Sequence, residues 1–401
     1  NPKNFSFLNK YQITNQIPCH ISYTNKSVHK ILRDGFEKSP LFDGSIQGLG
    51  PRYCPSIEDK ITRFAEKERH QIFIEPEGRE TCEIYVNGFS TSLPENIQNE
   101  ALKQIPGFEK VKLFRPGYAI EYDYFPPVQL FHTLETKPIS NLYFAGQING
   151  TTGYEEAACQ GLMAGINAAF KIDKRDPFIL KRNEAYIGVL IDDLVTKGTD
   201  EPYRMFTSRA EYRIILRQDN ADLRLTPIAQ KIGLATTKRI KRLERKTAYI
   251  NELIDTLKSK NIQPNEINPK LESLGESTIS RNTRLERLLS RPNIRFEDIR
   301  EAKAFESFFQ KNNDDQEAIE QAEIQIKYSG YIQKEQENVE KFNRLESIKI
   351  PEDFNFSKIK SISSEGREKL TKIKPKTIGQ ASRISGVSPS DISVLLVYMG
   401  R

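Results

Sequence analysis

The sequence predicts a mixed α/β fold in the first part of the chain and an all-α domain in the rest. Three short runs of β-branched or aromatic residues before residue 90 predict strands. Glycines break the chain at 146–153, between a short apolar run and a helical pattern. Beyond about residue 175 glycine becomes sparser, and apolar residues recur three and four apart, which predicts amphipathic helices.

The composition restricts the class of protein. The 401 residues are enough for two or three domains, and 37% hydrophobic with 28% charged residues predicts a soluble, globular chain. No apolar run approaches the roughly 20 residues that span a bilayer, so we expect no membrane segment. The net charge of +6 is compatible with a polyanionic partner but does not require one.

The cysteines and histidines argue against a metal site and a disulfide framework. The four cysteines show no CxxC spacing, and the four histidines form no ligand-type cluster. This cysteine usage is typical of a reducing cytoplasm. Every cysteine and histidine precedes residue 160, so the helical part offers no thiol or imidazole chemistry. We therefore expect that part to bind a partner.

We expect four regions along the chain, bounded at 1–120, 121–172, 173–365 and 366–401. The first is an α/β domain with strands at 20–24, 71–74 and 83–86. The second contains the glycine-rich unit, the third is helical, and the fourth is a helical hairpin. The opening NPKNFSFLNKYQ has no signal-peptide layout and is typical of a strand already under way, so we expect the chain to begin inside a domain.

Apolar spacing predicts helices at 240–257 and 342–348 in the third region. Segments 263–278 and 351–365 are rich in Asn, Pro, Ser and acidic residues, which predicts linkers between helix groups.

The glycine-rich unit carries the first candidate site. Tyr143–Ala145 predicts the end of a short buried strand, and a helix with small residues at spacings of three and four follows. Such a turn aims free N–H groups and the positive end of a helix dipole at whatever lies above the strand. It therefore suits a flavin or nucleotide cofactor, with Thr151, Thr152 and Gly153 as donors. The alternative is a plain βα turn without a ligand.

The second candidate is the run 48–64. Pro55 and Ser56 can begin a helix, which places Cys54 just before a helix N-terminus and two residues from Arg52. The helix N-terminus and the arginine both favour the thiolate form, so Cys54 is a candidate nucleophile. A small buried apolar cysteine is an equally good interpretation.

Two further patterns concern binding. Arg209, Arg213 and Arg217, preceded by Arg204, are four apart and would share one face of a helix that could grip phosphates. Salt bridges at a surface or a subunit contact are an alternative. At the C-terminus, Thr377 and Ser388 are N-caps of two short helices joined at Gly386, which predicts a helical hairpin or, more loosely, a helix-turn-helix.

Four long blocks, in order, resemble one family. They are GLGPRYCPSIEDKITRF, RPGYAIEYDYFPP, LETKPISNLYFAGQINGTTGYEEAACQGLMAGINAA and TSRAEYRIILRQDNADLRLT, and the resemblance continues through QASRISGVSPSDISVLLVYM. The chain resembles the glucose-inhibited division protein A family, the large flavin-binding subunits of the bacterial tRNA uridine-5-carboxymethylaminomethyl modification enzyme. The resemblance implies an α/β flavoprotein: an incomplete Rossmann-like FAD domain (121–172) with an inserted α/β domain (1–120), followed by an all-α C-terminal domain.

The resemblance also implies the chemistry and the partners. The family binds FAD and reduced nicotinamide (NADH), takes a one-carbon unit from methylenetetrahydrofolate, forms a homodimer, and works with a GTPase subunit as a heterotetramer on the wobble uridine of tRNA. Cys54 matches a cysteine implicated in catalysis, and the C-terminal helices match the region that meets tRNA and the GTPase.

The cofactor-contacting residues follow from the same match. Gln147 matches the FAD-contact position, within a loop of Gly146, Gln147, Asn149, Gly150, Thr151, Thr152 and Gly153. The nicotinamide stretch comprises Gly50, Pro51, Arg52, Tyr53, Cys54, Pro55, Ser56, Ile57, Glu58, Asp59, Lys60, Ile61, Thr62, Arg63 and Phe64.

One departure and three rival functions accompany the resemblance. The family opens with a GxGxxG-type loop for the FAD pyrophosphate, and this sequence has none at its start, so we expect an N-terminally truncated chain that is inactive alone. The rivals are a folate- and FAD-dependent tRNA uridine C5-methyltransferase, which lacks a long helical C-terminal domain, a noncatalytic nucleic-acid-binding module, and a flavin disulfide reductase, which the missing CxxC disfavours.

Overall fold

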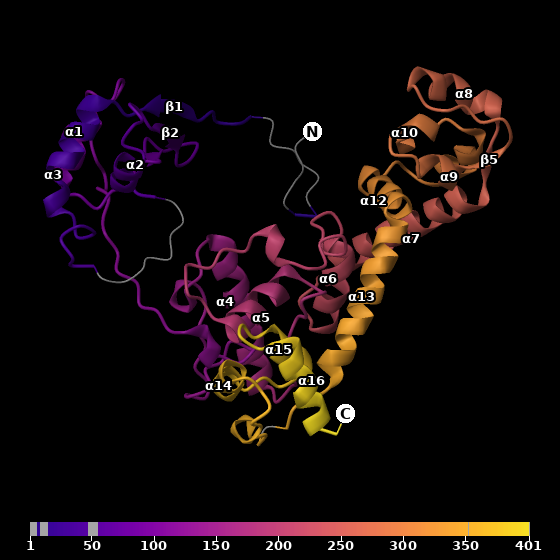
Figure 1. The fold of residues 1–401 in the computed structure, drawn as a ribbon. Coiled ribbons are helices and arrows are strands. Elements are labelled where there is room, and N and C mark those ends of the chain that lie inside the picture. Colours follow the sequence, from indigo (N-terminus) through magenta and orange to yellow (C-terminus); the bar gives the residue numbers. More distant parts are fainter. Residues whose placement is uncertain (1–5, 9–14, 47–54, 352, 401) are drawn as a thin grey trace. The chain divides into compact units, whose positions relative to one another are not determined.

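The computed structural model describes residues 6–8, 15–46, 55–351 and 353–400, and it divides into two compact units (Figure 1). Unit 1 consists mainly of Tyr11–Phe178 with Lys197–Met205, and unit 2 mainly of Ile179–Thr196 with Phe206–Arg401. Unit 1 is mixed α/β and unit 2 is helical apart from one short pair of strands. The predicted change from a mixed to a helical architecture is therefore confirmed.

The sheet of unit 1 has three antiparallel strands in the order β1 (His20–Tyr23), β2 (Gln71–Pro76) and β3 (Ile84–Asn87). All three predicted strands are present. The register pairs Ile21 with Phe73 and Ile74 with Val86. Ile72 is fully buried whereas its neighbour Phe73 is exposed, because successive side chains of a strand point to opposite faces.

Three helices accompany this sheet, namely α1 (Lys26–Asp34), α2 (Ile57–Arg63) and α3 (Glu95–Leu102), with a 3-10 turn, η1 (Phe36–Lys38), after α1. They share one apolar core with β2. Its members are Val28, Leu32, Ile57, Ile61, Ile72, Phe89, Leu93, Ile97, Ala101, Leu102, Ile105 and Phe108. The predicted start of α2 is confirmed, because Ser56 and Asp59 form a reciprocal capping box around its first turn.

Two buried histidines predict that the stability of this part of unit 1 depends on pH. His29 lies 2.8 Å from the Thr24 hydroxyl, and the His29 and His70 rings are 5.3 Å apart. Burial is the main cause that lowers the pKa of both rings. His70 and Arg33 add to the lowering at His29, and Lys60 and Lys67 do so at His70, against a smaller opposing effect of Glu66.

A histidine whose pKa is lowered by folding disfavours the folded state once it is protonated. We therefore expect full stability above the ordinary histidine pKa of about 6.5, and a falling urea midpoint below it. The variant His29→Gln/His70→Gln should flatten this dependence, whereas His20→Gln, at an exposed position, should not. An unchanged slope in the double variant would contradict the assignment.

The remainder of unit 1 is loop-rich. It contains the 3-10 turns η2 (Pro127–Gln129) and η3 (Gln147–Asn149) and the long helix α4 (Tyr154–Ile172), which was predicted. The predicted buried strand at Tyr143–Ala145 is wrong. Tyr143 forms only an isolated bridge with Glu135, and Ala145 is exposed. A strand needs a neighbour along its length, and among the described residues this segment has a single bridging partner.

Unit 2 is built from helices. They are α5 (Tyr186–Lys197), α6 (Ala221–Lys231), α7 (Thr237–Ser259), α8 (Pro264–Ser273), α9 (Leu285–Leu289), α10 (Phe296–Ile299), α11 (Glu306–Lys311), α12 (Gln316–Lys327), α13 (Ser329–Ser347), α14 (Ser364–Ile373), α15 (Ile378–Arg383) and α16 (Pro389–Tyr398), with 3-10 turns η4 (Thr207–Arg209), η5 (Lys303–Phe305) and η6 (Phe356–Lys358). Strands β4 (Asn261–Ile262) and β5 (Thr283–Arg284) pair antiparallel.

The core of unit 2 follows the predicted periodicity of α7. Ile250, Leu253 and Leu257 are buried, and α12 packs along the same helix. The linker predicted at 263–278 is wrong, because most of it is α8. Pro264 occupies the first helical position, and the Glu266 carboxylate accepts a hydrogen bond from the Gln263 N–H at 2.8 Å. Burial of Ile267 and Leu271 stabilises the helix despite Pro269.

The described part of the chain offers neither a membrane-spanning helix nor a group of metal-ligating side chains. No helix there combines the length and apolar character required to cross a membrane. Within the same residues, no three His, Cys, Asp or Glu side chains are grouped so that they could hold a metal ion.

Candidate functional site

The glycine-broken loop before α4 needs glycine for two reasons. Gly146, Gly150 and Gly153 all have positive φ, and Gly153 has φ 114° and ψ 148°, a region almost closed to other residues. A Cβ at Gly153 would also lie 2.1 Å from both the Arg204 Nη1 and the Glu156 Oε2 atoms. The loop therefore passes so close to these two side chains that only a hydrogen fits.

Gln160, on α4, fixes the shape of this loop. Its side chain is fully buried, and its Oε1 accepts hydrogen bonds from the Gly146 N–H (3.2 Å) and the Asn149 Nδ2 (2.8 Å). Its Nε2 donates to the Thr151 hydroxyl at 2.9 Å. One amide thus ties both arms of the loop to the helix. Gln160 was not predicted as a site residue, although a glutamine on the small-residue helix, one turn after Glu156, was the available signal.

The structure separates the predicted cofactor residues into outward and inward groups. Gln147 is exposed, so its side-chain amide is available to a ligand. Thr151 and Thr152 are buried; the Thr151 hydroxyl donates to the Gly146 carbonyl (3.0 Å) and the Thr152 N–H to the Tyr203 carbonyl (2.8 Å). Those two donors are engaged inside the protein.

The first turn of α4 leaves its backbone N–H groups without a side-chain cap, since Gly153 is the N-cap residue. Two carboxylates follow in this turn. Glu156 is buried, accepts from the Met205 N–H (2.9 Å) and lies 3.5 Å from the Arg204 Nε. Glu156 therefore does more than complement the helix dipole, because it also holds the segment of Arg204 and Met205 against the start of α4.

The candidate cysteine, Cys54, lies outside the described residues, as do Gly50, Pro51, Arg52 and Tyr53. Of the other cysteines, Cys19 and Cys82 are exposed. Burial, reinforced by Glu156, raises the pKa of the Cys159 thiol to about 12, so this thiol is protonated at neutral pH. A packing role for Cys159 agrees with this protonation state, because a nucleophile requires the thiolate.

The described part of the predicted nicotinamide stretch, Pro55–Phe64, is only partly outward. Ile57, Glu58 and Ile61 are buried. The Glu58 Oε1 accepts from the Thr91 hydroxyl and the Ser92 N–H, both at 2.8 Å. Glu58 therefore holds the 91–92 turn, and the outward side chains of the stretch are Thr62, Arg63 and Phe64.

Of the two interpretations of the arginines, the shared helical face is wrong, whereas the salt-bridged alternative agrees with the pairing of Arg217 and Asp219. Between Phe206 and Arg217 only Thr207–Arg209 is helical, as one 3-10 turn, so residues four apart do not share a face. The Ile215 N–H donates to the Glu335 carboxylate (2.7 Å) and Arg217 pairs with Asp219 (3.2 Å). The first of these contacts is tertiary and the second is local, and together they hold the segment in an irregular conformation.

The predicted C-terminal hairpin is confirmed. Thr377 is the N-cap of α15, Gly386 turns the chain with φ 88°, and Ser388 is the N-cap of α16. Asp391 accepts hydrogen bonds from the N–H groups of Ser363 and Ser388, both at 2.8 Å. Burial alone would raise the pKa of Asp391, but the hydrogen bonds from Ser363 and Ser388 outweigh it and lower the pKa to about 2.

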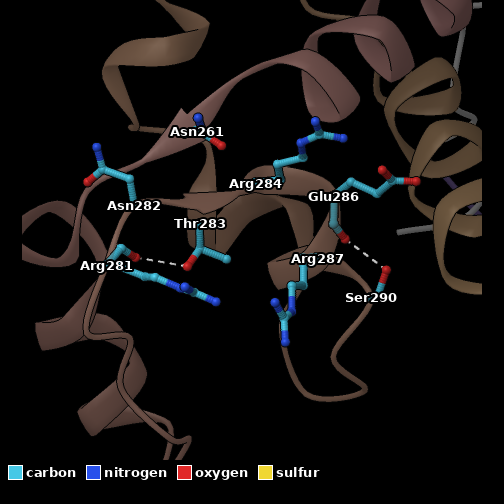
Figure 2. A pocket seen from close by; sticks show the side chains of 8 residues that line it. All are labelled: Asn261, Arg281, Asn282, Thr283, Arg284, Glu286, Arg287 and Ser290. Carbon is cyan, nitrogen blue, oxygen red and sulfur yellow. Dashed lines mark hydrogen bonds between the residues drawn. The ribbon is translucent and has the colours of Figure 1, made fainter.

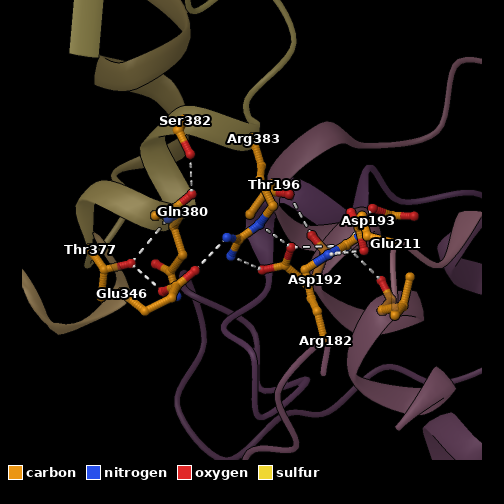
Figure 3. A network of polar contacts seen from close by, with 12 residues as sticks. Arg182, Asp192, Asp193, Thr196, Glu211, Glu346, Thr377, Gln380, Ser382 and Arg383 are labelled. Atoms are coloured by element: carbon orange, nitrogen blue, oxygen red, sulfur yellow. Dashed lines mark hydrogen bonds and ion pairs between the residues drawn. The ribbon is translucent and has the colours of Figure 1, made fainter. Parts of the chain in front are cut away.

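A buried ion cluster fastens this hairpin to α5 (Figure 3). The Arg182 guanidinium binds Asp193 (2.7 Å) and Asp192 (3.1 Å), and reaches Glu211 (2.6 Å). Arg383 of α15 forms a two-pronged pair with Asp192, at 2.6 and 2.7 Å, and also pairs with Glu346 of α13. Four segments far apart in the sequence are thus joined through two guanidinium groups.

Comparison with known proteins gives three family matches. The model described as Glucose inhibited division protein A matches residues 1–176. Two models for tRNA modifying enzyme MnmG/GidA match further on, the C-terminal helical domain at 237–336 and the C-terminal helical bundle at 338–401.

Individual relatives agree with these matches. Proteins of Christiangramia forsetii and Flavobacterium psychrophilum, each named tRNA uridine 5-carboxymethylaminomethyl modification enzyme MnmG, are 61% identical over 100% of this chain and 64% of their own length. The solved structure of Aquifex aeolicus GidA in the form II crystal superimposes with a TM-score of 0.78 and 45% identity, covering 97% of this chain and 59% of that one. The chain spans 64% of the length of these curated relatives, and it belongs to the glucose-inhibited division protein A family.

Proposed function

We propose that this chain acts in the FAD-dependent modification of the tRNA wobble uridine, by which a carboxymethylaminomethyl or aminomethyl group is added at C5. The supporting observation is the end-to-end match, at 61% identity, with relatives that carry the name of this enzyme. We propose a GTPase subunit as the partner, in a heterotetramer with a homodimer of this protein, acting in the cytoplasm.

The loop before α4 fits one end of FAD. The Gln147 amide is exposed and can both donate to and accept from a ribityl hydroxyl. Asn149 is fully buried, so it supports the loop from within, and Gln147 is the residue available for contact. The uncapped N-terminus of α4 adds backbone donors. FAD, when bound, supplies redox chemistry, and these residues would position it.

For the remaining ligands the support is the family resemblance. We propose that residues 50–64 contact the reduced nicotinamide NADH, with the outward Thr62, Arg63 and Phe64 available among the described part. Methylenetetrahydrofolate is the proposed one-carbon donor. We also propose four domains. Residues 1–120 form the inserted domain and 121–172 the C-terminal part of a Rossmann-like FAD domain. Residues 173–365 form the helical domain, and 366–401 form the hairpin that binds tRNA and the partner.

Cys54 is the proposed catalytic nucleophile. Its thiolate would add to C6 of uracil, which moves the electron pair of the C5–C6 double bond to C5 as an enolate. That carbon then attacks the electrophilic one-carbon unit. Loss of the proton from C5 restores the double bond and expels the thiolate, so the nucleophile is regenerated.

Replacing Cys54 by Ser in the full-length protein tests this role. Because a serine hydroxyl is almost entirely protonated at neutral pH, we expect modification to fall by at least about 100-fold while FAD binding is retained. The measurement is the content of modified nucleoside in tRNA by mass spectrometry. Cys82→Ser, at an exposed cysteine, is the matched control. Full activity of the Cys54→Ser variant would remove the nucleophile role.

The function itself is tested on the full-length protein with its GTPase partner. We expect the purified protein to show flavin absorbance and the pair to add the C5 substituent to unmodified tRNA. A product carrying a C5 methyl group would instead identify the folate-dependent methyltransferase reaction. A colourless protein that takes up no FAD would contradict both.

A further inference from the structure

Strands β4 and β5 and helix α9 of unit 2 form a polar groove (Figure 2). The local sequence explains it. Leu285, Leu288 and Leu289 are fully buried, so the positions between and beside them face outward. The groove encloses about 560 Å³ and is lined by Asn261, Arg281, Asn282, Thr283, Arg284, Glu286, Arg287 and Ser290.

The groove is positively charged. Its lining holds three arginines and one glutamate, a net formal charge of +2 from three positive and one negative side chain. All three arginines are exposed, and among the described residues no carboxylate forms an ion pair with any of them. By contrast, the nearby Arg291 is engaged with Glu276, at 3.7 Å. Three arginines without a carboxylate partner among the described residues therefore line one groove.

Short local contacts fix the groove walls. The Thr283 hydroxyl donates to the Arg281 carbonyl at 2.9 Å, and the Ser290 hydroxyl donates to the Glu286 carbonyl at 2.8 Å. Asn261 pairs with Arg284 across the two strands. Arg284 thus lies in β5 and Arg287 in α9, whereas Arg281 lies in the bend just before β5.

The side chains that line the groove indicate which class of ligand it can bind. All eight side chains are polar, with no aliphatic or aromatic anchor of the kind that dominates protein interfaces. Arginine forks bind phosphate through paired hydrogen bonds, and asparagine, threonine and serine suit the 2′-hydroxyl and sugar of RNA. We propose that this groove binds the phosphodiester backbone of RNA, here that of the tRNA substrate. The proposal rests on the proposed function and names a contact site for it.

The test uses the full-length protein and fluorescently labelled tRNA, with binding measured by anisotropy in graded salt. Neutralising three phosphate contacts should weaken binding roughly 100-fold at about 0.1 M salt and make the logarithmic salt slope shallower by about 2 to 3. We expect this of Arg281→Gln/Arg284→Gln/Arg287→Gln. Replacing the same arginines by lysine should weaken binding less, because the charge is kept while the fork is lost.

The matched control removes the same charge from an exposed face of α7, by Lys238→Gln/Lys241→Gln/Arg245→Gln. It should bind within about threefold of the unsubstituted protein. If both triple variants lost the same tRNA affinity, the effect would come from net charge alone, and the proposal that the groove is the binding site would be wrong. Retained tRNA binding with lost GTPase binding would overturn it in favour of an acidic protein partner. If the unsubstituted protein binds no tRNA, the proposed function fails, and the groove proposal fails with it.

Discussion

Replacing Arg182 by Met should lower the free energy of unfolding of unit 2 by about 3 to 5 kcal/mol, because it removes one partner of a buried ion cluster. The Arg182 side chain is 4% exposed, and those of Asp192 and Asp193 are 6% and 2% exposed. Removing the guanidinium takes the 2.7 Å ion pair from Asp193 in surroundings where a carboxylate is poorly solvated. Burial lowers the pKa of Arg182, but Asp193 leads the carboxylates that raise it above the ordinary arginine value.

The measurement is the urea midpoint followed by circular dichroism at neutral pH. Glu211→Gln is the matched control, since Glu211 meets the same guanidinium but is 49% exposed, and it should change stability by less than about 1 kcal/mol. Asp193→Asn combined with Arg182→Met should recover part of the loss, because the buried charge is removed together with its partner. Equal midpoints for Arg182→Met and Glu211→Gln would show that the cluster adds little.

Gly153→Ala should disable the loop before α4, for which we propose a role in FAD binding. An alanine would have to adopt φ 114° with ψ 148°, at a cost of about 1 to 3 kcal/mol in backbone strain, and its Cβ would lie 2.1 Å from the Glu156 Oε2, so this buried side chain would have to shift. We expect a lower urea midpoint and at least a tenfold loss in FAD affinity, about 1.4 kcal/mol. The readout is flavin absorbance per protein after gel filtration of the full-length variant.

Gly161→Ala offers a control in the same helix. Gly161 has no heavy atom within 4 Å of an added Cβ, so the substitution meets open space. Alanine in a helix interior should stabilise by about 0.5 to 1 kcal/mol relative to glycine. A Gly153→Ala variant that retained full flavin and an unchanged midpoint would show that the loop tolerates another conformation.

Elements encoded by neighbouring residues could be predicted from the sequence. The starts of α2, α15 and α16 follow from Ser56, Thr377 and Ser388, because a cap and its partner lie within three residues. The amphipathic pattern of α7 likewise identified buried Leu253 and Leu257. In these cases the physical cause is contained in one short window of sequence.

Features that depend on distant contacts were missed. Gln160 and Glu58 look like ordinary polar helix residues until the loop and the 91–92 turn are brought against them. Composition alone suggested a linker where burial of Ile267 and Leu271 stabilises α8. The regular spacing of arginines after Arg204 suggested a helix, but the Glu335 carboxylate and Asp219 hold that segment otherwise.

The pairing of Arg383 with Asp192 also bears on how the chain is made. The two residues are 191 positions apart, so the second guanidinium can reach α5 only after the whole intervening segment has been synthesised. Contacts of such long sequence separation form late and slowly. Until then Asp192 has Arg182 as its partner but not Arg383. Nascent chains halted before residue 383 should therefore be degraded more readily than chains that include Arg383.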